Sequence, residues 1–295
     1  MSTPAATGLV FPAGAARSAA AAAAMIRLPW RRNAWRGPSG EWSGVGLGSS
    51  VDFQDHRTYS PGDDLRYVNW AAFARTDSLL LKVHRHEAAP VVDLVCDVST
   101  SMGLGDAKAR RSAELILFAL ESAERHAGGL RCYAVAGGTV APIEPAALRR
   151  GELPQLDTAG GQAPALDRVP WRAEALRVLV SDLLFAPELG TAWIRRLGGA
   201  LGLGLLLVPW STEEAAPDWD GRMDFEDCET TTRREQRVDA ELLGRYRAAY
   251  VRHIAGWREA CRRAGVLMAR VPAEPPLVDA LNAEALPAGA LEPLR

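Results

Sequence analysis

Three side chains that carry oxygen atoms follow a valine-rich apolar run at 91–96. Asp97, Ser99 and Ser101 stand at positions i, i+2 and i+4. A carboxylate and two hydroxyls are hard oxygen ligands of the kind that Mg²⁺ and Mn²⁺ prefer. The spacing therefore predicts a divalent-ion site. A second interpretation stays open, in which the two serines only cap the helix that follows.

The elements that must position these residues can be predicted from an alternation of apolar runs and amphipathic segments. We expect strands at 91–97, 130–136, 176–181, 203–208 and 266–271, an edge strand at 222–227, and helices at 106–127, 189–201 and 239–264. This alternation predicts an α/β fold with a mostly parallel sheet and helices on both faces. Such sheets bind ligands at the carboxyl ends of their strands, where Asp97 falls. Asp182 follows a second strand at that edge, and we expect it to anchor an ion-bound water from the opposite side.

Composition narrows the class of protein. The chain has 295 residues, a formal net charge of −2 and 48% hydrophobic residues, which is ordinary for a globular protein and gives no reason to expect nucleic acid as a partner. Its four cysteines form no C-x-x-C pair, which favours a reducing compartment and argues against a zinc site. The alanine run at 19–24 is too weakly apolar to span a bilayer, so we expect a cytoplasmic protein without a membrane span.

Changes in composition divide the chain into four parts. Residues 1–26 are expected to be disordered up to about residue 14 and then to form a short helix. Residues 27–88 form a polar and aromatic segment that we expect to contain β-structure and to pack on the core. Residues 89–286 hold the α/β domain, and 287–295 are expected to be a tail.

The polar segment carries a distinctive set of residues, namely Arg57, Tyr59, Gly62, Asp63, Asp64, Arg66, Trp70 and Arg75. Together with the D-x-S-x-S pattern at 97–101 and the pair Ser181-Asp182, this set resembles domain-of-unknown-function family 58. The family comprises bacterial proteins in which such a signature precedes a von Willebrand factor A-like domain. The resemblance extends over residues 25 to 285 or so.

The resemblance implies a von Willebrand A-like, Rossmann-like fold of the soluble subgroup that lacks transmembrane helices. It also implies a metal-ion-dependent adhesion site, in which Ser99 and Ser101 would bind Mg²⁺ or Mn²⁺ and Asp97 would hold a water. The adhesion site also needs a threonine, for which Thr158 is the best candidate. The implied partners are a MoxR-type AAA+ ATPase and a protein client that offers an acidic residue.

The signature segment shows no nucleophile paired with a base. We expect its arginines and acids to pair with one another, Tyr59 and Trp70 to pack beneath them, and the segment to form part of a recognition surface.

These features predict a non-enzymatic protein-interaction module. One alternative is a metal-dependent hydrolase or phosphotransferase. A haloacid-dehalogenase-like enzyme, however, needs a second aspartate where Ser99 stands. The other alternative is a structural scaffold without an ion.

Overall fold

The computed structural model describes residues 9–30, 45–46, 53–61, 63–65, 68–85, 91–156, 164–185, 191–199, 202–230 and 232–294. The chain forms two compact units. The larger one comprises Met1–Trp30 and Pro90–Arg295, and the smaller one comprises Arg31–Ala89.

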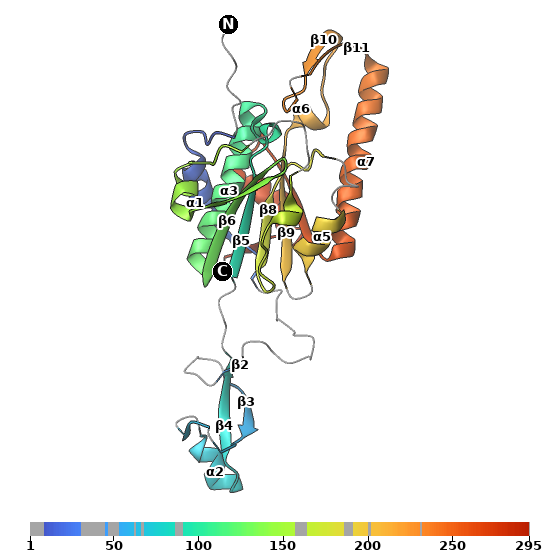
Figure 1. Ribbon diagram of the computed structural model, residues 1–295. Helices are drawn as coiled ribbons and strands as arrows, with labels where there is room; N and C mark the ends of the chain where they lie inside the picture. Colours follow the sequence, from blue (N-terminus) through green and yellow to red (C-terminus); the bar gives the residue numbers. More distant parts are fainter. Residues whose placement is uncertain are drawn as a thin grey trace. The chain divides into compact units, whose positions relative to one another are not determined.

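A six-stranded sheet forms the centre of the larger unit (Figure 1). Its order is β12 (Leu267–Pro272), β9 (Leu203–Trp210), β8 (Leu176–Val180), β5 (Val91–Asp97), β6 (Gly129–Ala136) and β7 (Thr139–Ile143). Neighbouring strands are parallel except β7, which turns back antiparallel to β6. Counted along the chain, the order is 3-2-1-4-5-6, that of doubly wound folds, and it reverses between β5 and β8. The predicted α/β class with a mostly parallel sheet is confirmed.

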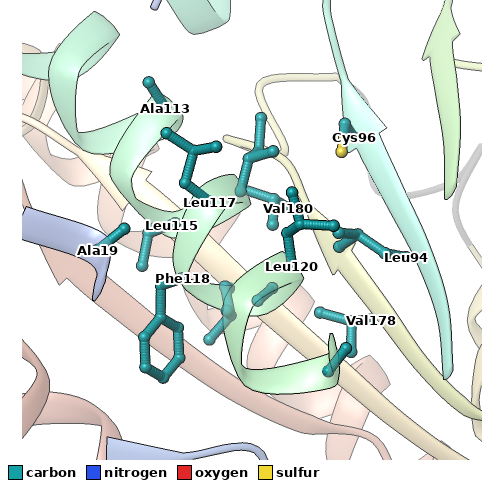
Figure 2. Close-up of a cluster of buried hydrophobic side chains, with 14 of the residues drawn as sticks. Ala19, Leu94, Cys96, Ala113, Leu115, Leu117, Phe118, Leu120, Val178 and Val180 are labelled. Atoms are coloured by element: carbon teal, nitrogen blue, oxygen red, sulfur yellow. The ribbon is translucent and has the colours of Figure 1, made fainter. Parts of the chain in front are cut away.

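Helices cover both faces of this sheet (Figure 1). On one face lie α3 (Asp106–His126) and α1 (Ala15–Ala23), and on the other lie α5 (Thr191–Gly198) and α7 (Ala240–Ala264). Because side chains alternate along a strand, Leu94 of β5 faces the first layer and Val95 faces the second. Figure 2 shows the first layer, where Leu117 and Leu120 of α3 lie beside strand residues of β5 and β8.

The remaining elements of this unit are short connections. They are η2 (Thr100–Gly103), α4 (Pro145–Arg149), η3 (Leu166–Arg168), α6 (Thr212–Ala215), α8 (Leu277–Ala280) and the π-helical turn η5 (Leu281–Ala285). Among the described residues, no helix is both long and apolar enough to cross a membrane.

The predicted edge strand at 222–227 forms outside the central sheet, so this expectation was wrong in its placement. It corresponds to β10 (Gly221–Glu226), which pairs antiparallel with β11 (Arg233–Val238) in a separate two-stranded hairpin. The burial pattern of β10 alternates between half-buried and exposed residues, so neither of its faces is fully buried. Its backbone hydrogen bonds are instead made with β11, so β10 is not added to an edge of the central sheet.

Both ends of the chain contribute to the larger unit, which corrects two expected boundaries. Leu9, expected in a disordered segment, is buried, and the alanine face of α1 packs on α3. Leu291, expected in a tail, is also buried. Strand β13 (Glu292–Pro293) pairs with β1 (Ile26–Arg27), and Glu292 forms an ion pair with Arg27 at 3.3 Å.

The smaller unit contains a three-stranded antiparallel sheet of β2 (Val45–Gly46), β4 (Leu80–Arg85) and β3 (Phe53–Thr58), with helix α2 (Trp70–Thr76). Among the residues whose side chains are described in this unit, Val68, Ala72 and Leu81 are buried. The Asn69 side chain caps α2 by accepting a hydrogen bond from the Ala72 backbone N–H at 3.2 Å. The Asp63 N–H donates a hydrogen bond to the Ser60 carbonyl at 3.0 Å, as in a tight turn.

Candidate functional site

Asp97 ends β5 at the point where the strand order reverses, and its side chain is almost fully buried. One carboxylate oxygen accepts a hydrogen bond from the Ser99 backbone N–H at 3.0 Å. The other oxygen accepts one from the Ser181 hydroxyl, directly after β8, at 2.7 Å. The carboxylate therefore joins the ends of the two neighbouring strands on either side of the reversal.

The two serines of the D-x-S-x-S pattern face each other. Their hydroxyl oxygens lie 3.1 Å apart, and both side chains are buried. Ser99 is the N-cap residue of η2 but its side chain makes no capping hydrogen bond, and α3 begins after Gly105 without a side-chain cap. The structure thus does not support the interpretation in which the serines only cap a helix.

Asp182 lies beside this loop on a turn with unusual backbone geometry. Its backbone N–H contacts the Met102 sulfur at 3.2 Å, and one of its carboxylate oxygens accepts from the Leu184 N–H at 3.2 Å. The next residue, Leu183, has a φ of 58°, in the left-handed region that residues other than glycine rarely adopt. The Trp257 indole N–H donates to the Leu183 carbonyl at 3.1 Å, which helps to hold the turn.

Lys108, in the first turn of α3, forms a buried ion pair with Asp182. Its ammonium lies 2.8 Å from an Asp182 oxygen and 2.6 Å from an oxygen of Glu214 on α6. The side chains of Lys108 and Asp182 are each 2% exposed. The Tyr250 hydroxyl of α7 donates to the other Glu214 oxygen at 3.0 Å, which extends the polar network to a third helix.

The charges of this cluster act on one another. Burial, followed by the negative charge of Asp182, raises the pKa of Asp97 to about 7, although hydrogen bonds from Ser181 and Ser99 oppose the rise. Burial lowers the pKa of Lys108, but the charges of Asp182 and Glu214 outweigh burial, and its pKa is raised overall. Lys108 is therefore charged at neutral pH.

The tip of the β10–β11 hairpin adds further acidic residues near this edge. Asp227 closes the tip by accepting hydrogen bonds from the backbone N–H groups of Glu229 at 2.9 Å and Thr230 at 2.7 Å. Burial, the charge of Asp182 and the charge of Asp227 raise the pKa of Glu229. The charge of Asp182 therefore acts on Glu229 across the space between the turn after β8 and the hairpin.

The structure brings together four of the five predicted metal ligands, namely Asp97, Ser99, Ser101 and Asp182. Thr158 lies outside the described residues. Within the described part of the chain, no group of three or more histidine, cysteine or acidic side chains is arranged to bind a metal.

The signature residues lie in the smaller unit. Gly62, Arg66 and the Arg57 side chain are outside what the structure describes. Tyr59, Asp63 and Asp64 are half-buried. Trp70 was expected to pack beneath the charged residues, but it is 58% exposed and contacts Phe73 edge-on, so this expectation was wrong. Arg75 donates to the Ala71 carbonyl at 3.2 Å, one turn back on its own helix.

Sequence reasoning missed Lys108 and Glu214. One signal was present, because Lys108 is one of only two lysines in a chain with 34 basic residues. A compact ammonium on a flexible stem fits a narrow site between two carboxylates better than a planar guanidinium does. Glu214 offered no comparable signal, since it lies in an ordinary acidic first turn of α6.

Comparison with known protein families gives a match to the part of the chain that carries Asp97, Ser99 and Ser101. The model of a family described as protein of unknown function DUF58 matches residues 55–130, a narrower range than the expected 25 to 285. The matched range includes the signature segment, Asp97, Ser99, Ser101 and Lys108. A search of curated proteins found no match. The predicted resemblance is confirmed over the matched range, residues 55–130.

Proposed function

We propose that this chain is a non-enzymatic protein-binding module of von Willebrand A type. In this proposal a divalent ion at Ser99 and Ser101 recognises an acidic side chain of a partner. We place its action in the cytoplasm, where its four free cysteines would remain reduced.

The observation that carries the proposal is the distance between the two serine hydroxyls. Mg²⁺ takes octahedral ligands at about 2.1 Å, so two adjacent ligands lie about 3.0 Å apart. The Ser99 and Ser101 oxygens are 3.1 Å apart. The hydroxyls therefore fit two neighbouring positions around Mg²⁺ or Mn²⁺ without a change of rotamer. Asp97, held behind them by the Ser99 N–H, would retain an ion-bound water.

The charge on the proposed ligands explains why an acidic partner would be recognised. Serine hydroxyls are neutral, so an ion bound through them keeps most of its positive charge and can accept an external carboxylate. Two apolar side chains flank the loop and the turn that carry the site, Leu104 at 59% exposure and Leu184 at 41%. A matching partner surface would present an acidic residue among apolar ones.

The partner that the family resemblance implies is a MoxR-type AAA+ ATPase, and a client protein with an exposed acidic residue is the second. We propose that the smaller unit contributes to the same recognition. Its exposed Trp70 supports this role, because exposed tryptophans are enriched where partners bind.

The direct test is isothermal titration of the full chain with Mg²⁺ and with Mn²⁺. We expect wild type to bind, and Ser101→Ala to lose most of the heat because one ligand is removed. Ser18→Ala, on α1 in the same unit, is the matched control and should bind as wild type does. Binding of the ATPase should require Mg²⁺ and disappear in Asp97→Ala. ATPase binding that survives both EDTA and Asp97→Ala would contradict the proposal.

The alternative of a phosphotransferase is less well supported by the geometry. A nucleophilic aspartate must reach its substrate, but Asp97 is 1% exposed and both of its oxygens accept hydrogen bonds. Turnover of a phosphate ester that is lost in Asp97→Asn would favour that alternative. Thermal unfolding that does not respond to Mg²⁺ would favour the ion-free scaffold.

A further inference from the structure

Lys108 is a buried cation beside the proposed ion site. Its ammonium contacts Asp182 at 2.8 Å and Glu214 at 2.6 Å. Burying an ammonium is costly unless carboxylates compensate it, and here two of them do. The two ion pairs are therefore part of the folded structure at this edge of the sheet, and Lys108 is shielded from solvent.

Asp182 links this ammonium to the serine loop. Its backbone N–H contacts Met102, the residue after Ser101, at 3.2 Å. The preceding residue, Ser181, donates its hydroxyl to Asp97 at 2.7 Å. Asp182 thus lies beside the loop that carries Ser99 and Ser101, and its negative charge acts on both Lys108 and Asp97.

We propose that Lys108 is a tethered cation that competes with the divalent ion for Asp182 and so keeps the ion affinity of the site low. This inference rests on the proposed function and adds a positioning residue to it. The neutral serines supply no charge to offset repulsion between the ammonium and the ion. A partner carboxylate would offset it, so ion and partner would bind together more strongly than either binds alone.

The attachment of Lys108 fits this role. Lys108 lies on the first turn of α3. Its second carboxylate, Glu214, accepts a hydrogen bond from the Tyr250 hydroxyl at 3.0 Å. Glu214 lies in α6, and its backbone N–H donates to the hydroxyl of Ser211, which caps that helix, at 3.2 Å. Lys108 is therefore held by carboxylates from two elements, the turn after β8 and helix α6. Relief of the competition must come from the ligand side.

The test is calorimetric titration of the full chain with MgCl₂, comparing wild type with Lys108→Met. Removing the ammonium frees Asp182, and we expect Mg²⁺ to bind about tenfold more tightly or better, the size seen when groups behind a metal ligand are changed. Arg110→Met is the matched control. It removes an exposed positive charge from the same helix and should change the affinity less than about twofold.

A second variant tests whether a change in Mg²⁺ affinity comes from competition for Asp182 or from the net charge of the cluster. It also provides a second folded protein for the comparison. Lys108→Met combined with Glu214→Gln removes one positive and one negative charge, so the formal charge of the cluster is conserved, and the glutamine can still accept from Tyr250. Neutralising Glu214 together with Lys108 leaves one buried carboxylate without its ammonium instead of two. We expect the double variant to bind Mg²⁺ about tenfold more tightly than wild type as well.

The outcomes distinguish the two proposals. If wild type binds Mg²⁺ and the folded Lys108 variants bind no more tightly, the role of Lys108 is wrong and the ion site stands. If no variant binds Mg²⁺, both proposals fail. If only the Lys108 variants bind, the competition is supported, and the native protein does not bind the free ion by itself.

Discussion

At the scale of single residues, the site is dominated by two acids that are buried away from solvent. Asp97 and Asp182 end neighbouring strands and both are buried. Lys108 compensates Asp182 directly, whereas Asp97 receives only neutral donors, the Ser99 N–H and the Ser181 hydroxyl. An isolated buried carboxylate binds a proton more readily than one in water. The two acids therefore differ in their partners, because the one lysine of the site pairs with Asp182.

Asp97 should make the protein less stable as pH rises through neutrality. Its pKa in the folded state is about 7, against an ordinary value of 3.8, so between these values the folded state binds a proton that the unfolded state lacks. The associated stability is complete below about pH 4 and lost above about pH 7, on the order of 4 kcal/mol in all.

The variant Asp97→Asn cannot ionise, and we expect its free energy of unfolding relative to wild type to improve between pH 5 and pH 8. Urea denaturation in EDTA measures this difference. Asp106→Asn, at an exposed position of α3, should follow the wild-type pH dependence. If the free energy of unfolding of Asp97→Asn changed between pH 5 and pH 8 by as much as that of wild type, Asp97 would not be the acid responsible.

At the scale of elements, α7 is longer than the sheet that it covers. Its 25 residues span about 38 Å, whereas the eight residues of β9 span about 26 Å. Its buried residues begin only at Tyr250 and continue with Ile254, Trp257 and Cys261. The first turns of the helix therefore depend less on buried packing than on capping and on hydrogen bonds, such as those that Tyr246 and Arg247 donate to the backbone carbonyls of Glu214 and Pro217.

The N-cap of α7 should consequently matter for stability. The Asp239 carboxylate accepts a hydrogen bond from the Leu242 N–H at 2.8 Å. Asp239→Ala removes this bond, and we expect it to lower the free energy of unfolding by about 1 kcal/mol. Asp239→Asn keeps the cap and should stay close to wild type in the same urea titration. Equal losses in both variants would show that charge, and not capping, is the cause.

At the scale of the whole molecule, the larger unit is discontinuous in sequence. Residues up to Trp30 and from Pro90 onward fold together, and Arg31–Ala89 form the smaller unit between them. The first part is fully integrated, because Ala19 and Ala22 of α1 are buried and β1 pairs with β13. Among the described residues, the two hydrophobic clusters of the larger unit are built from its own side chains.

Replacing residues 31–89 with a flexible Gly/Ser linker of about 20 residues should leave the larger unit folded, with cooperative thermal unfolding. Deleting residues 1–25 should abolish that cooperativity, since it removes α1 and exposes the face of α3 that it covers. Partner binding should be lost in the linker variant if the smaller unit takes part in recognition. Unchanged binding would assign recognition to the larger unit alone.

The sequence alone determined the order of strands β5, β6, β8, β9 and β12 and of helices α3, α5 and α7, because burial on both faces requires apolar runs and amphipathic helices. It also placed Asp97 and Asp182 at one edge, since both follow parallel strands. It could not place residues 222–227, whose hairpin depends on a partner strand, or Leu9 and Leu291, whose burial depends on distant contacts.

Only the tertiary structure decided what surrounds Asp182. Lys108 and Glu214 stand 74 and 32 residues away from it in sequence, and neither falls in a local pattern that predicts contact. Their meeting depends on the packing of α3 and α6 at the carboxyl edge of the sheet. The separation of the two serine hydroxyls likewise depends on the path of a short turn, because hydrogen-bond distances follow from backbone torsions that residue types alone do not specify.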